Sequence, residues 1–101
     1  MTASALDTIK IDLESMKVVK SGQPVDLTPT EFRLLRYLVN HPNRPFSRGA
    51  LIEAIWGYSS NIGSDRTVDV HIRHLRQKLE DDPSEPRWIL TMCGFGYKFQ
   101  P

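Results

Sequence analysis

The chain has 101 residues, of which 40% are hydrophobic and 25% are charged, and we expect one soluble domain with a single core, not two domains. Its formal net charge of +1 does not mark a nucleic-acid binder, so that function can only be inferred from local clustering of charge. No apolar run approaches the roughly 18 residues that a membrane span needs, and the first residues lack the order of a signal peptide, so no membrane contact is expected.

The first part of the chain predicts short strands. Residues 1–8 are mostly small and polar, and we expect them to be a linker or leader segment before a domain at residues 9–100. Apolar residues alternate with polar ones over 9–14, and further β-type patterns occupy 16–20 and 25–27. This period of two, interrupted by turn residues, indicates short antiparallel strands joined by tight turns.

A helix start follows the strands. Thr28 is expected to be the N-cap, Pro29 the first helical residue, and Glu31 the residue that completes a capping box. The helix should end near Pro42, which cannot continue it. Its predicted buried residues are Phe32, Leu35, Leu38 and Val39.

A second helix is predicted from the cap residue Ser47 to Gly57, with apolar residues at helical spacing between them. A polar loop, residues 58–64, separates it from a third helix. We expect Asp65 to cap that third helix and Pro83 to close it.

The third helix, over residues 66–79, is the most informative part of the chain. At about 100° per residue, its apolar residues fall within roughly 60° of one another and predict a core-facing stripe. The stripe comprises Val68, Ile72, Leu75 and Leu79. The opposite arc carries Thr67, Val70, His71, His74 and Lys78, flanked by Arg66, Arg73 and Arg76. Asp69 is the only acid among these cations, whereas an ordinary solvated face mixes both signs, so the pattern favours a nucleic-acid face over a solvated one.

Two β-type runs, at residues 88–92 and 97–99, flank the glycine-rich stretch 93–96 and predict a hairpin. The order of strands, three helices and a hairpin predicts an α+β domain. Two helices that lead to a cationic third helix and then to a hairpin indicate a helix-turn-helix with a wing.

Five motifs in this order have a familiar form. They are LTPTEFRLL at 27–35, SR leading to IWG within 47–57, DRTVDVHIR at 65–73, LRQKL at 75–79 and GFGY at 94–97. Together they closely resemble the effector domain of OmpR/PhoB-type two-component response regulators, over about residues 9–100. The resemblance implies a winged helix-turn-helix with an N-terminal four-stranded antiparallel sheet, three helices and a C-terminal β-hairpin wing.

The resemblance also implies a function and partners. It implies sequence-specific binding of double-stranded DNA for transcription regulation, as a tandem dimer on a direct-repeat operator. In full-length relatives a receiver domain, phosphorylated by a sensor kinase, precedes this domain, and the loop at residues 57–64 is the surface offered to RNA polymerase.

Matching positions imply roles for individual residues. The base-reading positions are Thr67, Val70 and His74, in the major groove. The phosphate-contacting positions are Arg48, Trp56, Arg66, His71, Arg73, Arg76, Thr91 and Tyr97. These side chains suit the roles, because arginine binds phosphate without reading sequence and the methyl groups of Thr and Val can pack on a thymine methyl.

Two positions depart from the family pattern. Relatives often carry arginine where this chain has His74, and a neutral imidazole offers only one donor and one acceptor, so the operator is not transferable. Relatives also frequently carry arginine at the wing position of Cys93, so we expect wing contact here to be weaker or confined to the backbone.

Other functions fit the sequence less well. His71 and His74 are one turn apart, but zinc needs at least three protein ligands, so no metal site or cofactor is expected. No enzyme motif has the required spacing, and we expect no enzyme. The single cysteine excludes an intramolecular disulfide and indicates a reducing, cytoplasmic setting. Cys93 could be a redox switch, but a plain turn residue is the better interpretation.

The remaining alternative is a winged-helix protein-interaction module that contacts RNA polymerase or a partner regulator without specific DNA reading. The loop at 57–64 and the loss of basic residues at two contact positions motivate it. The clustering of Arg66, Arg73 and Arg76 with Thr67 still favours DNA binding.

Overall fold

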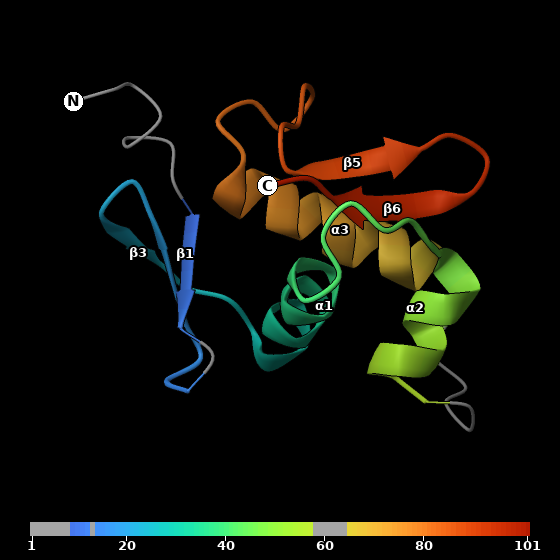
Figure 1. The fold of residues 1–101 in the computed structure, drawn as a ribbon, viewed down its shortest axis with the longest axis horizontal. Coiled ribbons are helices and arrows are strands. Elements are labelled where there is room, and N and C mark those ends of the chain that lie inside the picture. The colour runs from blue at the N-terminus through green and yellow to red at the C-terminus, as the bar shows by residue number, and fades with distance from the viewer. Residues whose placement is uncertain (1–8, 13, 58–64) are drawn as a thin grey trace.

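The computed structural model describes residues 9–12, 14–57 and 65–101 and arranges them as three helices and two small sheets (Figure 1). In chain order the elements are β1 (Ile9–Asp12), β2 (Lys17–Lys20), β3 (Gln23–Val25), α1 (Pro29–Val39), β4 (Phe46–Ser47), α2 (Arg48–Ile55), α3 (Asp65–Leu79), β5 (Ile89–Met92) and β6 (Gly96–Phe99). This order confirms the predicted α+β winged helix class.

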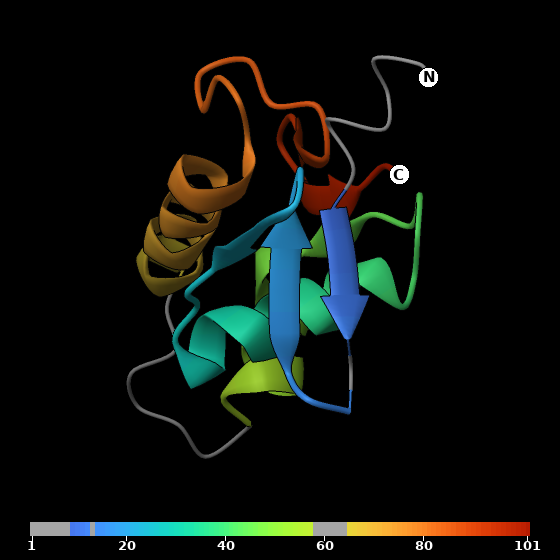
Figure 2. The same ribbon diagram turned by 90° about the vertical axis from the view of Figure 1, so that its left-hand side faces the viewer.

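The N-terminal sheet is antiparallel and has the order β1-β2-β3 (Figure 2). Ile9 lies opposite Lys20, and Val18 lies opposite Val25. The expectation of four strands is wrong for the described residues, which form three strands in this sheet. Residues 26–28 alone separate β3 from α1, and the last of them is the helix cap, so no length remains there for another strand.

The predicted start of α1 is confirmed. The hydroxyl of Thr28 accepts from the backbone N–H of Glu31 at 3.1 Å, and the carboxylate of Glu31 accepts from the backbone N–H of Thr28 at 3.0 Å. Each bond satisfies a donor that a helix start leaves unpaired. The helix ends at Val39, three residues before Pro42. Val39 is only half-buried, and Leu34 is fully buried in addition to the predicted stripe.

The cap of α2 is also as predicted, because the hydroxyl of Ser47 accepts from the backbone N–H of Ala50 at 3.1 Å. The helix ends at Ile55, and the chain leaves it through Gly57 at φ 89°, a left-handed conformation that glycine adopts without a Cβ penalty.

The wing is larger than the predicted hairpin. β5 and β6 pair as expected, but β6 also pairs with β4, which gives the order β4-β6-β5. In that added pairing Phe46 lies opposite Tyr97, and Ser47 lies opposite Gly96. A two-residue strand is too short to show a period, so the sequence pattern did not predict β4.

α3 begins at Asp65, whose side chain lies outside the described part of the structure, so its predicted capping role stays a prediction. The helix ends at Leu79, before the stop that was expected at Pro83. The reason is Glu80, which is only 4% exposed and whose carboxylate accepts from the backbone N–H groups of residues 87–89 at 2.7–3.1 Å. A buried carboxylate needs such partners, and here it ties the end of α3 to the start of β5.

The core lies where the three helices meet the wing strands. The predicted α3 stripe is confirmed, because its four residues are at most 1% exposed. The N-terminal sheet lies at the end of the molecule where α3 finishes (Figure 1). Val18 joins the core there, and Lys20 pairs with Asp81 at 2.6 Å beyond α3. None of the helices in the described ranges is long and apolar enough to cross a membrane.

Candidate nucleic-acid interface

α3 runs between the wing strands on one side and α1 and α2 on the other (Figure 1). The side chains opposite its buried stripe form what we call the outward face, made of Arg66, Val70, Arg73 and Gln77. Both arginines and Gln77 are exposed, and Val70 is half-buried. The outward face therefore offers cations, an amide and an aliphatic group, a combination that suits phosphates and base edges.

On the wing side of α3, one carboxylate connects three elements. Asp69 accepts from Arg48 Nε at 2.7 Å and from the Tyr97 hydroxyl at 2.6 Å. Arg48 is the first residue of α2, and Tyr97 lies on β6. Asp69 thus fixes the angle between α3, the start of α2 and the wing.

The electrostatics of this cluster hold it together at neutral pH. Burial pushes the pKa of Asp69 upward, but the hydrogen bonds from Arg48 and Tyr97 outweigh it, so the pKa of Asp69 is lowered and the carboxylate stays ionised. Burial and the hydrogen bond to Asp69 raise the pKa of Tyr97, which keeps its hydroxyl protonated as a donor. The cluster can therefore persist until the solution becomes acid.

We predict that Asp69→Asn makes the stability of the domain less dependent on acid pH. Because the folded pKa of Asp69 is lowered, its contribution is complete above its ordinary value of 3.8 and is lost as pH falls through the folded value. Urea unfolding between about pH 6 and pH 3 should show a shallower fall in the free energy of unfolding for Asp69→Asn than for the parent. Equal slopes would show that the cluster adds nothing to stability.

Arg76 also reaches the wing from α3. Its Nε donates to the backbone carbonyl of Ile89 at 3.0 Å, and its Nη2 donates to the Thr91 hydroxyl at 2.7 Å. Burial lowers the pKa of Arg76, but an arginine remains charged. Two of its five N–H donors are thereby used to anchor the wing, and Thr91, which is exposed, lies beside it.

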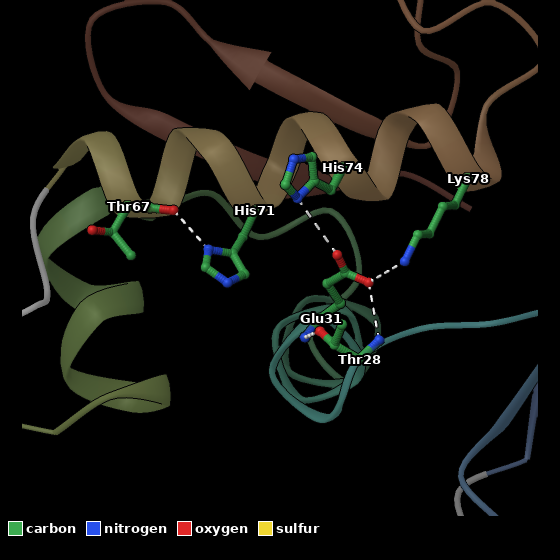
Figure 3. Close-up of polar contacts among 6 residues, drawn as sticks. All are labelled: Thr28, Glu31, Thr67, His71, His74 and Lys78. Atoms are coloured by element: carbon green, nitrogen blue, oxygen red, sulfur yellow. Dashed lines mark hydrogen bonds and ion pairs between the residues drawn. The ribbon is translucent and has the colours of Figure 1, made fainter.

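On the side toward α1, Glu31 receives side chains from α3 (Figure 3). This carboxylate is only 3% exposed, and it accepts from Lys78 Nζ at 2.6 Å. The Nδ1 atom of His74 lies 3.6 Å from its other oxygen. Burial raises the pKa of Glu31, but the bonds from Lys78 and the backbone of Thr28 outweigh it, and the pKa is lowered. Glu31 is therefore an ionised buried group that joins α1 to α3.

One turn earlier, His71 is held by its own helix. Its Nδ1 lies 2.8 Å from the backbone carbonyl of Thr67, which can only accept, so Nδ1 carries the proton (Figure 3). The ring packs edge-on against Trp56, with centroids 5.1 Å apart. In the described residues no group of three or more His, Cys, Asp or Glu side chains is placed to hold a metal ion.

The predicted contact residues thus fall into three groups on one helix and its neighbours. Toward the wing lie Arg48, Arg76, Thr91 and Tyr97; on the outward face lie Arg66, Val70 and Arg73; toward α1 and α2 lie Trp56, Thr67, His71 and His74. Two carboxylates that organise the outer groups, Asp69 and Glu31, were not predicted as site residues. Asp69 could have been noticed as the lone acid of a cationic helix, but Glu31 showed only a capping signal.

Comparison with known proteins agrees with this geometry. Residues 22–99 match the family described as transcriptional regulatory protein, C terminal. A probable transcriptional regulatory protein of Picosynechococcus is 49% identical over 85% of this chain and 34% of its own length. The DNA-binding response regulator MtrA of Mycolicibacterium smegmatis is 40% identical over 96% of this chain and 42% of its own length. The chain thus spans between about a third and two fifths of these relatives.

Solved structures share the fold. Response regulator DrrB of Thermotoga maritima, an OmpR/PhoB homologue, aligns with a TM-score of 0.85 and 33% identity over 92% of this chain and 42% of that one. The DNA-binding domain of Klebsiella pneumoniae RstA, in complex with the RstA box, aligns with a TM-score of 0.82 and 36% identity over 92% of this chain and 91% of that one. The fold and the exposed cationic helix define a winged helix domain of the OmpR/PhoB class. The chain belongs to the family of C-terminal domains of transcriptional regulatory proteins.

Proposed function

We propose that this domain binds double-stranded DNA sequence-specifically and regulates transcription as the effector part of a two-component response regulator. The observation that carries the proposal is the outward face of α3, where exposed Arg66 and Arg73 flank Val70 on a helix with a wing beside it. An α-helix fits the major groove of B-DNA, and a wing can follow the neighbouring backbone. The RstA and AdeR DNA-binding domains, at 36% and 28% identity, were each solved in complex with DNA, which supports the same use here.

Within this proposal some side chains of α3 contact bases and others contact phosphates. Thr67, Val70 and His74 read base edges from the part of α3 that enters the groove. Arg66 and Arg73, exposed on either side of Val70, bind phosphates.

The other predicted contacts act from the flanks. Arg48 is anchored to Asp69, and Arg76 is anchored to the wing strand β5. Their remaining N–H donors and their charge act on the DNA phosphate backbone. Tyr97 is 5% exposed with its hydroxyl bonded to Asp69, so its contact with phosphate is the smallest of the set. Trp56, His71 and Thr91 complete the phosphate-contacting set at the edges of α3.

The partners follow from the family and belong to the longer protein. We propose tandem dimers on a direct-repeat operator, a receiver domain phosphorylated by a sensor kinase, and action in the cytoplasm. We also propose contact with RNA polymerase through the loop at residues 57–64, of which 58–64 lie outside the described structure. No enzymatic activity or cofactor is proposed.

The proposal is tested by salt-dependent duplex binding of the parent, Arg73→Ala and Lys10→Ala. Lys10 is an exposed cation on β1, away from α3, so its removal is a matched change in net charge. Arg73→Ala should weaken binding to every sequence alike and lower the slope of log affinity against log salt by about 1, because one phosphate contact no longer releases a counterion. Lys10→Ala should leave that slope nearly unchanged. Fluorescence anisotropy with labelled duplexes at four salt concentrations measures both.

Two outcomes would count against this assignment. Equal losses for Arg73→Ala and Lys10→Ala would mean that only net charge matters. Failure of the parent to bind any duplex at low salt would favour the protein-interaction module in place of DNA recognition.

A further inference from the structure

The contact between Glu31 and His74 gives a buried carboxylate of α1 a direct influence on a base-reading side chain. Glu31 Oε1 is already occupied, because it accepts from Lys78 Nζ at 2.6 Å and from the backbone N–H of Thr28 at 3.0 Å. The oxygen that faces His74 is Oε2, 3.6 Å from Nδ1. Figure 3 shows that the ring presents Nδ1 to the carboxylate and carries Nε2 on the side away from it.

The imidazole itself remains available for a ligand. The side chain of His74 is 47% exposed, whereas that of Glu31 is 4% exposed. The carboxylate of Glu31 therefore cannot reach DNA. Its negative charge nevertheless acts on the imidazole of His74, which is exposed enough to reach DNA. A neutral imidazole carries its proton on one nitrogen only, and a negative charge beside one nitrogen favours the proton there. With the proton on Nδ1, the outward Nε2 is a hydrogen-bond acceptor.

We infer that Glu31 is a positioning residue that fixes the tautomer of His74 so that Nε2 accepts a hydrogen bond from an exocyclic amino group of one base in each half-site. The inference rests on the DNA binding proposed above. In the major groove such a donor is the N6 amino group of adenine or the N4 amino group of cytosine. Guanine and thymine present acceptors at the corresponding edge, which would face the lone pair of Nε2.

This chemistry differs from that of arginine, which the family often carries at this position. A guanidinium has donors only and selects guanine. An imidazole held by Glu31 has the opposite polarity at its outer nitrogen. At one base pair this domain should therefore prefer adenine or cytosine, where an arginine-bearing relative prefers guanine.

The first test is spectroscopic and needs no DNA. In the free domain at about pH 8, the imidazole nitrogen chemical shifts of His74 should show a protonated Nδ1 and an unprotonated Nε2. In Glu31→Gln the population should move toward protonated Nε2. Glutamine can still complete the capping box, so α1 should keep its start. A parent ring with its proton mainly on Nε2 would overturn the inference.

The second test measures base preference. A selection from randomised duplexes with the parent identifies the half-site, and competition among the four base pairs at each position then gives the preferences of the parent, Glu31→Gln, Glu85→Gln and His74→Arg. Glu85 is an exposed acid in the loop after α3 and controls for the lost charge. One position should prefer adenine or cytosine by about three- to tenfold in the parent and in Glu85→Gln, the amount that one hydrogen bond supplies. Glu31→Gln should lose most of that preference, and His74→Arg should replace it with guanine.

The outcomes separate this inference from the proposed function. A parent that selects no duplex would reject DNA binding itself. A parent that selects a site whose preferences are identical in Glu31→Gln and His74→Arg would leave DNA binding intact and reject the role of Glu31.

Discussion

Ile72→Ala should lower the free energy of unfolding by about 2–5 kcal/mol, the range for removal of a buried large aliphatic side chain. Ile72 is 1% exposed at the centre of the α3 stripe, where α3 packs against α1 and α2. The loss has two parts, the transfer of the removed carbons from water and the cavity that the close-packed neighbours cannot fill.

Urea unfolding at neutral pH measures the effect, with Gln77→Ala as the matched change. Gln77 is exposed on the same helix, five residues further on, and alanine there keeps helix propensity. Its stability should stay within about 0.5 kcal/mol of the parent. A free energy of unfolding for Ile72→Ala equal to that of Gln77→Ala would mean that the faces of α3 have been assigned in reverse.

Gly96→Ala should destabilise the domain by an amount at or beyond the upper end of the about 1–3 kcal/mol typical of overpacking. A Cβ at this position would lie 1.9 Å from the backbone oxygen of Phe46 and 2.9 Å from Ser47 Cα. Both are main-chain atoms, so no change of rotamer can relieve the clash. The β4–β6 pairing must open, and Ser47, which is also the cap of α2, must move with it.

The wing and the start of α2 both flank α3. Gly96→Ala should therefore also weaken duplex binding at low temperature, by more than the loss of folded protein there would account for. The control is Gly49→Ala inside α2, where an added Cβ meets nothing within 4 Å and the helix should gain up to about 1 kcal/mol. Denaturant unfolding and anisotropy on the same samples give the two quantities. If Gly96→Ala were as stable as Gly49→Ala, the close approach of β4 to β6 would not exist in solution.

A feature of the fold could be predicted from the sequence where the residues that produce it lie close together along the chain. Thr28 and Ser47 are hydroxyl residues at helix starts, and their bonds span three residues, so the sequence around them is sufficient to predict the caps. The buried stripe of α3 follows from a helical period over fifteen residues, and all four of its members are buried. Strand alternation and glycine turns likewise predicted the antiparallel pairs at both ends of the chain.

Where the pattern was short or came from the family alone, the structure differed. β4 is two residues long and exists because β6, about fifty residues later, supplies its partner. The fourth N-terminal strand was implied by the resemblance and not by any pattern in residues 9–28, and the described chain has none there.

The candidate site divides in the same way. Helical spacing alone put Arg66, Val70 and Arg73 on one exposed face, because geometry within a helix needs no tertiary information. The bonds that orient the flanking groups could not be read from spacing, since Asp69 meets Tyr97 across 28 residues and Glu31 meets Lys78 across 47. Buried carboxylates are stable only where donors surround them, and those donors come from separate elements that meet when the chain packs. Local propensity and periodicity therefore decide which elements form and which face is exposed, whereas tertiary packing decides which charges are paired and which stay exposed.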